Sequence, residues 1–380
     1  MGVRFLHTSD WQLGMTRAFL PSGSQARYTD DQIEAVRRMA HLAQEAGCTF
    51  AVVAGDVFDS IQPDRQVLSR ALDALGSFTV PVFVLPGNHD ADTPAAFWST
   101  SDVISRLPGK VFVLRDSVPA KVPGVNAEVV GAPWPSRRPG MDLVSAVIAK
   151  LGPPTPGSYR VLVGHGEVDI LSPDPFGPEL ISLSNLERAV AEHRISYGAL
   201  GDRHSVTEVG ATGAVWYSGA PVATDYGEVA PNQVLVVEIG QGGVSVEPVE
   251  VGSWHFIERS FDITGPQSVS FVEKFLDQLP AKERTVVKLS FVGTVNLAAW
   301  TMLEGVLEHA SDLFAAIQRS ATRSDLVVVA DGSDLAELEL SGFASQALAD
   351  LVATAAGGGP RSEVAADALM LLYRLAGRSR

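Results

Sequence analysis

The sequence has a single cysteine, Cys48, and no long uncharged apolar segment. One cysteine excludes an internal disulfide framework and a cysteine-rich zinc site, and it fits a reducing compartment. No apolar stretch reaches the roughly 18 residues that a membrane-spanning helix needs. The N-terminus leads into a strand-like run without a signal-peptide pattern. From these absences we expect a cytoplasmic protein without membrane association.

Basic residues are also scarce, because 29 lysines and arginines stand against 44 aspartates and glutamates, for a formal net charge of −15. Lysine and arginine supply most of a protein's affinity for nucleic-acid phosphates, so this balance excludes a basic protein that coats nucleic acid. DNA as a substrate is not excluded, since bound metal ions or a partner subunit can supply positive charge locally. The length of 380 residues and the apolar share of 46% indicate a folded chain with two or more domains.

Strand-like and helix-like segments alternate through the first 150 residues. Apolar runs predict strands within 3–10, 48–56 and 81–90, and helical spacing of apolar residues predicts helices over 28–47 and 64–78. This alternation predicts an α/β fold with a largely parallel sheet that is covered on both faces. Short strands with glycine and proline turns follow and predict the second half of a two-sheet sandwich, closed by a hairpin over 238–252.

A smaller α/β module is predicted after residue 253. Its pattern is a strand over 254–264, a helix over 266–279, a strand over 284–293 and a helix over 296–310. An amphipathic helix is predicted over 362–378, after a glycine-rich stretch. We therefore expect three parts, at 1–252, 253–340 and 341–380.

Five polar turns follow apolar runs. They are Asp10-Trp11-Gln12, Gly55-Asp56-Val57-Phe58-Asp59, Gly87-Asn88-His89-Asp90, Gly164-His165 and Gly201-Asp202-Arg203-His204. Each alone indicates little, because a Gly-Asp pair after a strand is usually only a turn. Together they form a joint signal, since α/β sheets bind their ligands where the strands end.

The residue types in these turns suit a site with two divalent metal ions. Two ions about 3.5–4 Å apart can activate water, hold phosphate oxygens and stabilise the leaving oxygen of a phosphodiester. Asp56 is the natural bridging carboxylate, and Asn88 offers an amide oxygen. His165 and His204 offer imidazole nitrogens.

His89 has a different expected role, although it lies next to a candidate ligand. We expect it to face the substrate and donate a proton or a hydrogen bond to the leaving oxygen. Asp59 or Asp90 would hold its ring.

With these residues in view, the turns resemble those of the calcineurin-like metallophosphoesterase superfamily. Within it, "GDVFDS" and "VPVFVLPGNHD" are similar to DNA repair exonucleases of the SbcD type, the nuclease partners of an SMC-like ATPase (SbcC type) in double-strand-break processing. The resemblance covers about residues 3–240, whereas the later module corresponds to the family's capping domain by position and pattern only. It implies a two-sheet metallophosphoesterase sandwich flanked by helices, with a smaller α/β capping domain and C-terminal helices.

Carried over residue by residue, the resemblance implies two sets of metal ligands. The first ion would be held by Asp10, Gln12, Asp56 and His204, and the second by Asp56, Asn88, His165 and Asp202. His89 matches the family's catalytic histidine.

Two positions depart from the family's pattern. Gln12 replaces the usual histidine of the first turn, and Asp202 replaces the first histidine of the usual Gly-His-x-His turn. Both exchanges put oxygen where nitrogen is usual, and hard oxygen ligands suit Mn²⁺ or Mg²⁺ better than zinc. We expect two divalent ions at the site, with Mn²⁺ as the preferred metal and Mg²⁺ as the alternative. The first ion should bind more weakly, because a glutamine carbonyl is a poorer ligand than imidazole.

Three functions remain open at this point. The first is an SbcD-type exonuclease or endonuclease that acts on DNA with an ATPase partner, as a homodimer by analogy. The second is a metallophosphatase or phosphodiesterase on small nucleotides or phosphoproteins, and the third is a catalytically weakened DNA-binding subunit. The later module favours the first, since a small phosphatase would not need it. Arg17 and Arg203 are candidate phosphate contacts, and Trp11 either stacks on a base or packs at the strand end.

Overall fold

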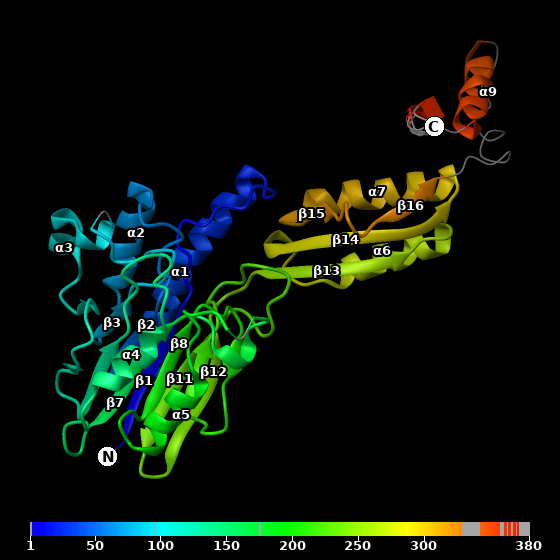
Figure 1. Ribbon diagram of the computed structural model, residues 1–380. Helices are drawn as coiled ribbons and strands as arrows, with labels where there is room; N and C mark the ends of the chain where they lie inside the picture. The colour runs from blue at the N-terminus through cyan, green and yellow to red at the C-terminus, as the bar shows by residue number, and fades with distance from the viewer. Residues whose placement is uncertain are drawn as a thin grey trace. The chain divides into compact units, whose positions relative to one another are not determined.

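The structure, a computed structural model, divides into two compact units (Figure 1). It describes residues 2–94, 96–174, 176–328, 343–357, 361–362, 364–365, 368–369 and 371. The first unit comprises Met1–Ala18 and Gln25–Trp254, and the second comprises Phe19–Ser24 and His255–Arg380. The short segment Phe19–Ser24 therefore groups with a part of the chain that is distant in sequence.

The first unit contains two six-stranded sheets. The first sheet has the order β12 (Gly243–Glu250), β11 (Gln233–Gly240), β1 (Val3–Thr8), β2 (Phe50–Ala54), β3 (Val82–Leu85) and β4 (Val111–Val113). Strands β1 to β4 pair in parallel, whereas β11 joins β1 antiparallel and forms a hairpin with β12. The mainly parallel sheet and the hairpin predicted over 238–252 are both present.

The second sheet has the order β5 (Ala120–Lys121), β6 (Ala127–Gly131), β7 (Tyr159–His165), β8 (Tyr197–Gly201), β10 (Val215–Ser218) and β9 (Val206–Glu208). Its four inner strands are parallel, and the edge strands β5 and β9 pair antiparallel. Parallel neighbours place their carboxyl ends at one edge of a sheet, so the turns that follow them gather there.

The two sheets pack face to face over an aromatic and aliphatic core. Phe5 of β1 stacks on Phe50 of β2 with ring centroids 4.8 Å apart, and the edge of Tyr197 from the second sheet meets Phe5 at 5.5 Å. All three side chains are fully buried. The strands are apolar on both faces because each sheet has this core on one side and helices on the other.

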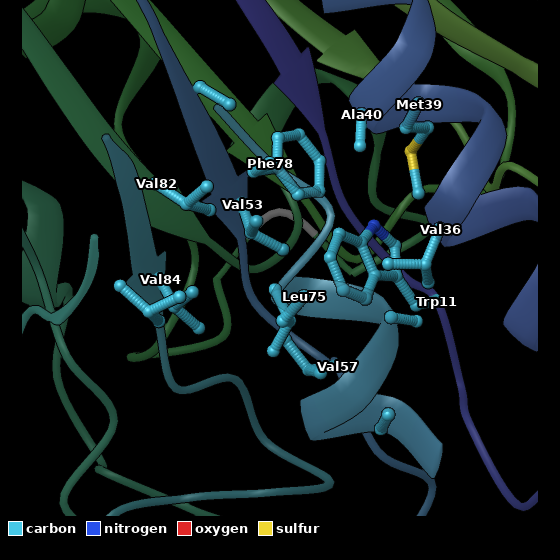
Figure 2. Packing of buried hydrophobic residues seen from close by; sticks show 14 of the residues in the cluster. Trp11, Val36, Met39, Ala40, Val53, Val57, Leu75, Phe78, Val82 and Val84 are labelled. Carbon is cyan, nitrogen blue, oxygen red and sulfur yellow. The ribbon is translucent and has the colours of Figure 1, made fainter. Parts of the chain in front are cut away.

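Helices cover the outer face of each sheet. They are α1 (Ser22–Glu45) and α2 (Arg65–Leu75) on the first sheet, and α4 (Leu143–Lys150) and α5 (Leu183–Ala191) on the second. The remaining helical segments of this unit are η1 (Phe97–Ser99), α3 (Ser101–Arg106) and η2 (Asp169–Leu171). Figure 2 shows Trp11 inserted among Val36, Met39 and Leu75. Trp11 is 2% exposed, so it is a core residue and not a stacking platform for a base.

The second unit is a small α/β module. Its elements are β13 (His255–Asp262), α6 (Pro266–Gln278), η3 (Lys282–Arg284), β14 (Thr285–Val295), α7 (Leu297–Leu313), β15 (Ala316–Arg319) and β16 (Asp325–Val328). The long strand β14 pairs in parallel with β13 along one edge, and with β15 and then β16 along the other. Its core packs apolar side chains of β14 against α6 and α7. The fold class that the sequence predicts is confirmed.

One further helix, α9 (Phe343–Ala356), follows in the described part of the chain. The amphipathic helix predicted over 362–378 lies mostly outside the described residues. Within the residues that the structure describes, every helix falls short of the length and apolar character that crossing a bilayer requires.

The inter-sheet core predicts a large stability cost for truncating Phe5. The Phe5→Ala variant should lower the free energy of unfolding by about 3–5 kcal/mol, because the lost ring leaves a cavity between two rigid sheets. Urea titration, with tryptophan fluorescence as the signal, measures the free energy of unfolding. The exposed Ile104 of α3 provides the control, and Ile104→Ala should change the free energy by no more than about 0.5 kcal/mol. Equal effects of the two substitutions would contradict this account of the core.

Candidate metal centre

The five predicted polar turns all lie at or directly after the carboxyl ends of strands, namely β1, β2 and β3 in the first sheet and β7 and β8 in the second. The two sheets bring these ends together. Carboxylate oxygens of Asp10 and Asp56 and a ring nitrogen of His165 lie within 4.8 Å of one another, and all three residues are buried. The structure therefore assembles residues from three turns that are up to 155 positions apart (165 minus 10).

The first turn has an unusual backbone. Asp10 and Gln12 both have positive φ angles, of 53° and 49°. Main-chain hydrogen bonds tie the turn to its neighbour, since Asp10 N donates to Gly55 O and Gln12 N donates to Asp56 O, each at 3.0 Å. Trp11 lies between them in sequence and is anchored in the core. The polar side chains on either side of it are thereby held at the strand end.

Asp56 occupies the middle of the cluster. Its φ is also positive, at 54°, and its side chain is 2% exposed. Oδ1 accepts a hydrogen bond from His89 N at 2.9 Å, and Oδ2 accepts one from Gln12 Nε2 at 3.0 Å. A Cβ atom on Gly87 would collide with this carboxylate, so the third turn approaches it closely only because it has glycine there.

Both ring nitrogens of His165 face oxygen atoms. Its Nδ1 lies 2.8 Å from the carbonyl oxygen of Ala54, which can only accept, so Nδ1 carries the hydrogen. Nε2 then has a lone pair in the neutral ring, yet it lies 2.9 Å from Asn88 Oδ1, 3.4 Å from Asp56 Oδ1 and 3.6 Å from Asp202 Oδ1. A lone pair facing three oxygens is stable only with a positive charge between them.

The pKa values of the clustered residues also indicate that the site lacks positive charge. Burial alone would lower the pKa of His165, but the carboxylate of Asp56 and, less strongly, that of Asp202 raise it well above its usual value. Burial raises the pKa of Asp10 to about 6. Burial also opposes ionisation of Asp56, but the His165 ring keeps the pKa of that carboxyl below its usual value. In this arrangement a proton takes the place that a metal cation suits.

Gln12 provides an independent test of the fit to a metal. Its Nε2 is used by Asp56, but its Oε1 is buried and has no hydrogen-bond partner. A buried amide oxygen without a partner is costly, and coordination of a cation would satisfy it. The donor set of carboxylates, amide oxygens and imidazoles therefore fits divalent ions with a preference for oxygen.

Asp202 and His204 come from the turn after β8. Asp202 also has a positive φ, 96°, and its backbone N donates to both carboxylate oxygens of Asp10, at 3.1 and 3.0 Å. His204 Nε2 lies 3.8 Å from Asp10 Oδ1, whereas its Nδ1 is 2.6 Å from Thr224 Oγ1 and 3.1 Å from Glu228 Oε1. Thr224 and Glu228 carry no motif, and the sequence does not reveal them.

His89 lies beside the cluster with its side chain 42% exposed. Its Nδ1 lies 3.2 Å from the main-chain oxygen of Asp59 and 3.6 Å from Asp59 Oδ1, and its Nε2 is 4.0 Å from Asp56 Oδ2. The bond with Asp59 is the largest cause that raises the pKa of His89, to about 9, so the ring is protonated at neutral pH. Between the two candidates for holding this ring, Asp59 has the contacts.

Asp90 has a different structural part. Its buried carboxylate accepts hydrogen bonds from the backbone of Gly87 at 2.7 Å, Val57 at 3.0 Å and Phe58 at 3.3 Å. It therefore joins the second turn to the third. Burial, reinforced by the charge of Asp56, raises its pKa to about 7.

The two arginines that the sequence suggests for phosphate binding both have protein partners. The guanidinium of Arg17 donates to the carbonyl oxygen of Thr224, and Nε of the exposed Arg203 donates to Thr207 Oγ1 at 3.0 Å. Their part in substrate binding stays a prediction.

Comparison with known proteins identifies a family whose sequence profile matches part of this chain. Residues 3–187 match the sequence profile of the calcineurin-like phosphoesterase family, a span that includes the first four turns and ends within α5. A stretch of 91 residues is 31% identical to the DNA double-strand break repair protein Mre11 of Archaeoglobus fulgidus. That match covers 23% of this chain and 19% of the relative, so the chain aligns with about a fifth of that protein's length.

Solved structures show a looser likeness. A protein of Thermus thermophilus covers 66% of this chain over 100% of its own length, with 11% identity and a TM-score of 0.41. A purple acid phosphatase from yellow lupin (Lupinus luteus) seeds covers 66% of this chain and 52% of its own, with 12% identity and a TM-score of 0.38. A dimetal phosphatase from Danio rerio covers 66% and 99%, with 12% identity and a TM-score of 0.36.

The charge-deficient cluster predicts that divalent metal stabilises the fold. Adding Mn²⁺ at 100 times its dissociation constant should raise the free energy of unfolding by about 2.7 kcal/mol, and EDTA should reverse the gain. Differential scanning calorimetry measures the change in Tm. Asp56→Asn keeps the shape but removes the central charge and should abolish most of the gain, whereas the exposed Asp116→Asn should retain it. An undiminished gain in Asp56→Asn would show that the ion binds elsewhere.

Proposed function

Residues 3–187 belong to the calcineurin-like phosphoesterase family, and from this premise we propose that the chain is a metal-dependent DNA nuclease of the SbcD type. The observation that carries the finer proposal is the 91-residue similarity to a DNA double-strand break repair protein. The site supports a phosphoester hydrolase in general, because it gathers acidic and imidazole ligands beside a protonated histidine. The natural reaction would be hydrolysis of phosphodiester bonds during DNA repair.

We assign the metal ligands as the turns suggest. One ion would be held by Asp10, Gln12, Asp56 and His204, and the other by Asp56, Asn88, His165 and Asp202. When bound, two divalent ions supply a nucleophile from water and a clamp on the phosphate oxygens. Because oxygen donors dominate, Mn²⁺ is the proposed ion and Mg²⁺ the alternative.

His89 is proposed as the proton donor to the leaving oxygen. Asp59 holds Nδ1 through its main-chain oxygen, so the ring is oriented while Nε2 stays free of that bond. The raised pKa, about 9, keeps a proton on the ring at neutral pH, and the partial exposure of the side chain lets a substrate reach it. The main-chain N of His89 also donates to Asp56 Oδ1, so a hydrogen bond links the residue of the proposed acid directly to the proposed bridging ligand.

The charge balance supports a partner. The chain has a formal net charge of −15, and both candidate phosphate-binding arginines are engaged by protein oxygens. DNA affinity would therefore come from the metal ions and from a second, basic subunit. We propose an SMC-like ATPase of the SbcC type as that subunit, a homodimer of this chain as the assembly and the cytoplasm as its compartment.

The same charge balance also favours a second candidate, a phosphodiesterase of small nucleotides. A small substrate needs no extended basic surface. Metal-dependent turnover of bis(4-nitrophenyl) phosphate without cleavage of DNA, alone or with the ATPase, would favour this candidate. Binding of Mn²⁺ and DNA with hydrolysis of neither substrate would instead indicate a weakened DNA-binding subunit.

The nuclease proposal predicts a selective defect in His89→Ala. Cleavage of linear single- and double-stranded DNA with Mn²⁺ should fall by about 10²- to 10⁴-fold, because the leaving oxygen loses its proton donor. Mn²⁺ affinity should stay unchanged, since the main-chain bond to Asp56 remains. His41→Ala, at an exposed position of α1, is the control. Wild-type cleavage rates in His89→Ala would remove this residue from the mechanism.

The ligand assignment predicts a gain of affinity in Gln12→His. Imidazole is a better ligand than an amide oxygen, and histidine tolerates the left-handed backbone at this position. The weaker of two Mn²⁺ dissociation constants should fall roughly tenfold, equivalent to about 1.4 kcal/mol. Competition with Zn²⁺ should improve for the same ion. Calorimetric titration measures both, and an unchanged or weaker constant would exclude Gln12 as a ligand.

A further inference from the structure

We infer that Glu228, together with Thr224, is a positioning residue that fixes the ring of His204 so that Nε2 presents its lone pair to the first metal ion. The inference rests on the proposed function, because it assigns a role in the same site. Neither residue belongs to the five turns, and neither is a candidate ligand. They act from the loop between β10 and β11.

The carboxylate of Glu228 is buried, with its side chain 6% exposed, and is surrounded by donors. It accepts hydrogen bonds from Thr224 N, at 2.9 Å to Oε2 and 3.2 Å to Oε1, and a third from the Thr224 hydroxyl. His204 Nδ1 lies 3.1 Å from Oε1. The carboxylate thus has a fixed position beside the ring.

These contacts determine which ring nitrogen carries the hydrogen. A hydroxyl has one hydrogen, and Thr224 donates it to Glu228, which as a carboxylate can only accept. The oxygen of Thr224 can therefore only accept from His204 Nδ1, 2.6 Å away. Nδ1 must carry a hydrogen. In the neutral ring the lone pair is then on Nε2, which faces Asp10 at 3.8 Å, too far for a hydrogen bond.

The loop that carries Thr224 is held from several directions. Thr224 is 2% exposed, and its carbonyl oxygen accepts from Arg17. The preceding residue, Ala223, donates from its backbone to Asn232 Oδ1 at 2.9 Å and accepts from the hydroxyl of Tyr28 at 3.0 Å. With its neighbours fixed, the Thr224–Glu228 pair has little freedom to turn the His204 ring in any other way.

The first metal ion is the one that needs such help. Gln12 gives it a neutral amide oxygen where the family has an imidazole. A carboxylate hydrogen-bonded to a ligating histidine makes that ring a more basic ligand. Glu228 places a negative charge on the side of His204 away from the ion, and so strengthens the only imidazole in the proposed first set.

The test is a titration of the 380-residue chain with Mn²⁺ alone, in which isothermal calorimetry measures the binding. Glu228→Gln keeps the size of the side chain and removes its charge. It should weaken the weaker dissociation constant by about 10- to 100-fold and leave the tighter one unchanged. Thr224→Val, which removes only the hydroxyl, should shift the same constant by a smaller factor. Glu250→Gln on the exposed face of β12 is the matched control and should change neither constant.

Each outcome separates this inference from the proposed function. Two unchanged constants in Glu228→Gln, with Mn²⁺ bound normally by the wild type, would overturn the inference alone. Equal weakening of both constants, with a lower Tm of the metal-free chain, would assign Glu228 to the fold and also overturn it. If Glu228→Gln does not fold, an unchanged weaker constant in Thr224→Val has the same force. A wild-type chain that binds no Mn²⁺ would overturn both together.

Discussion

The candidate site depends on a backbone constraint, the left-handed conformation of polar residues at strand ends. Asp10, Gln12, Asp56 and Asp202 have φ angles of 53°, 49°, 54° and 96°. Each such residue costs about 1–3 kcal/mol in isolation, so the surrounding structure must hold it. Hydrogen bonds between turns do so, as when Asp202 N binds the Asp10 carboxylate. The buried Trp11 anchors the first turn from the other side. The left-handed turns direct the carboxylate and amide groups of both sheets toward the candidate metal site.

The electrostatic consequence is a site that lacks positive charge. Burial raises the pKa values of Asp10 and Asp90, and the neighbouring carboxylates raise those of His165 and His204 despite burial. The acids resist ionisation and the histidines retain protons for the same reason, which is that the site lacks positive charge. Divalent cations would supply this charge without protons, and they would release His165 and His204 to act as neutral ligands. The unpaired Oε1 of Gln12 indicates the same need by an argument that involves no titration.

The sequence predicts most of the polar residues at the strand ends, but few of the contacts that hold these residues in place. Apolar runs followed by Gly-Asp or Gly-Asn are local patterns, so the turns and the two-sheet fold follow from them. Glu228 is 24 residues from His204, and it lies in the loop between β10 and β11, which belong to different sheets. No local pattern encodes such a contact. The same reason hides the bond of Arg17 to Thr224, 207 residues away, which gives the half-buried Arg17 a protein partner. The sequence pattern does not predict helices α4 and α5, because these helices are short.

The two departures from the family's ligand pattern act in opposite directions on affinity, and only Asp202 changes the charge of the site. Gln12 weakens one set of ligands, whereas Asp202 adds a carboxylate to the other. The proposed ligands then include three carboxylates, from Asp10, Asp56 and Asp202, against the four positive charges of two divalent ions. The ions and these ligands together keep an excess of one positive charge, and the protonated ring of His89 adds a second one at the edge of the cluster. Because opposite charges attract most strongly at close range, the proposed ions would offset the net charge of −15 at the point where a phosphate group has to bind.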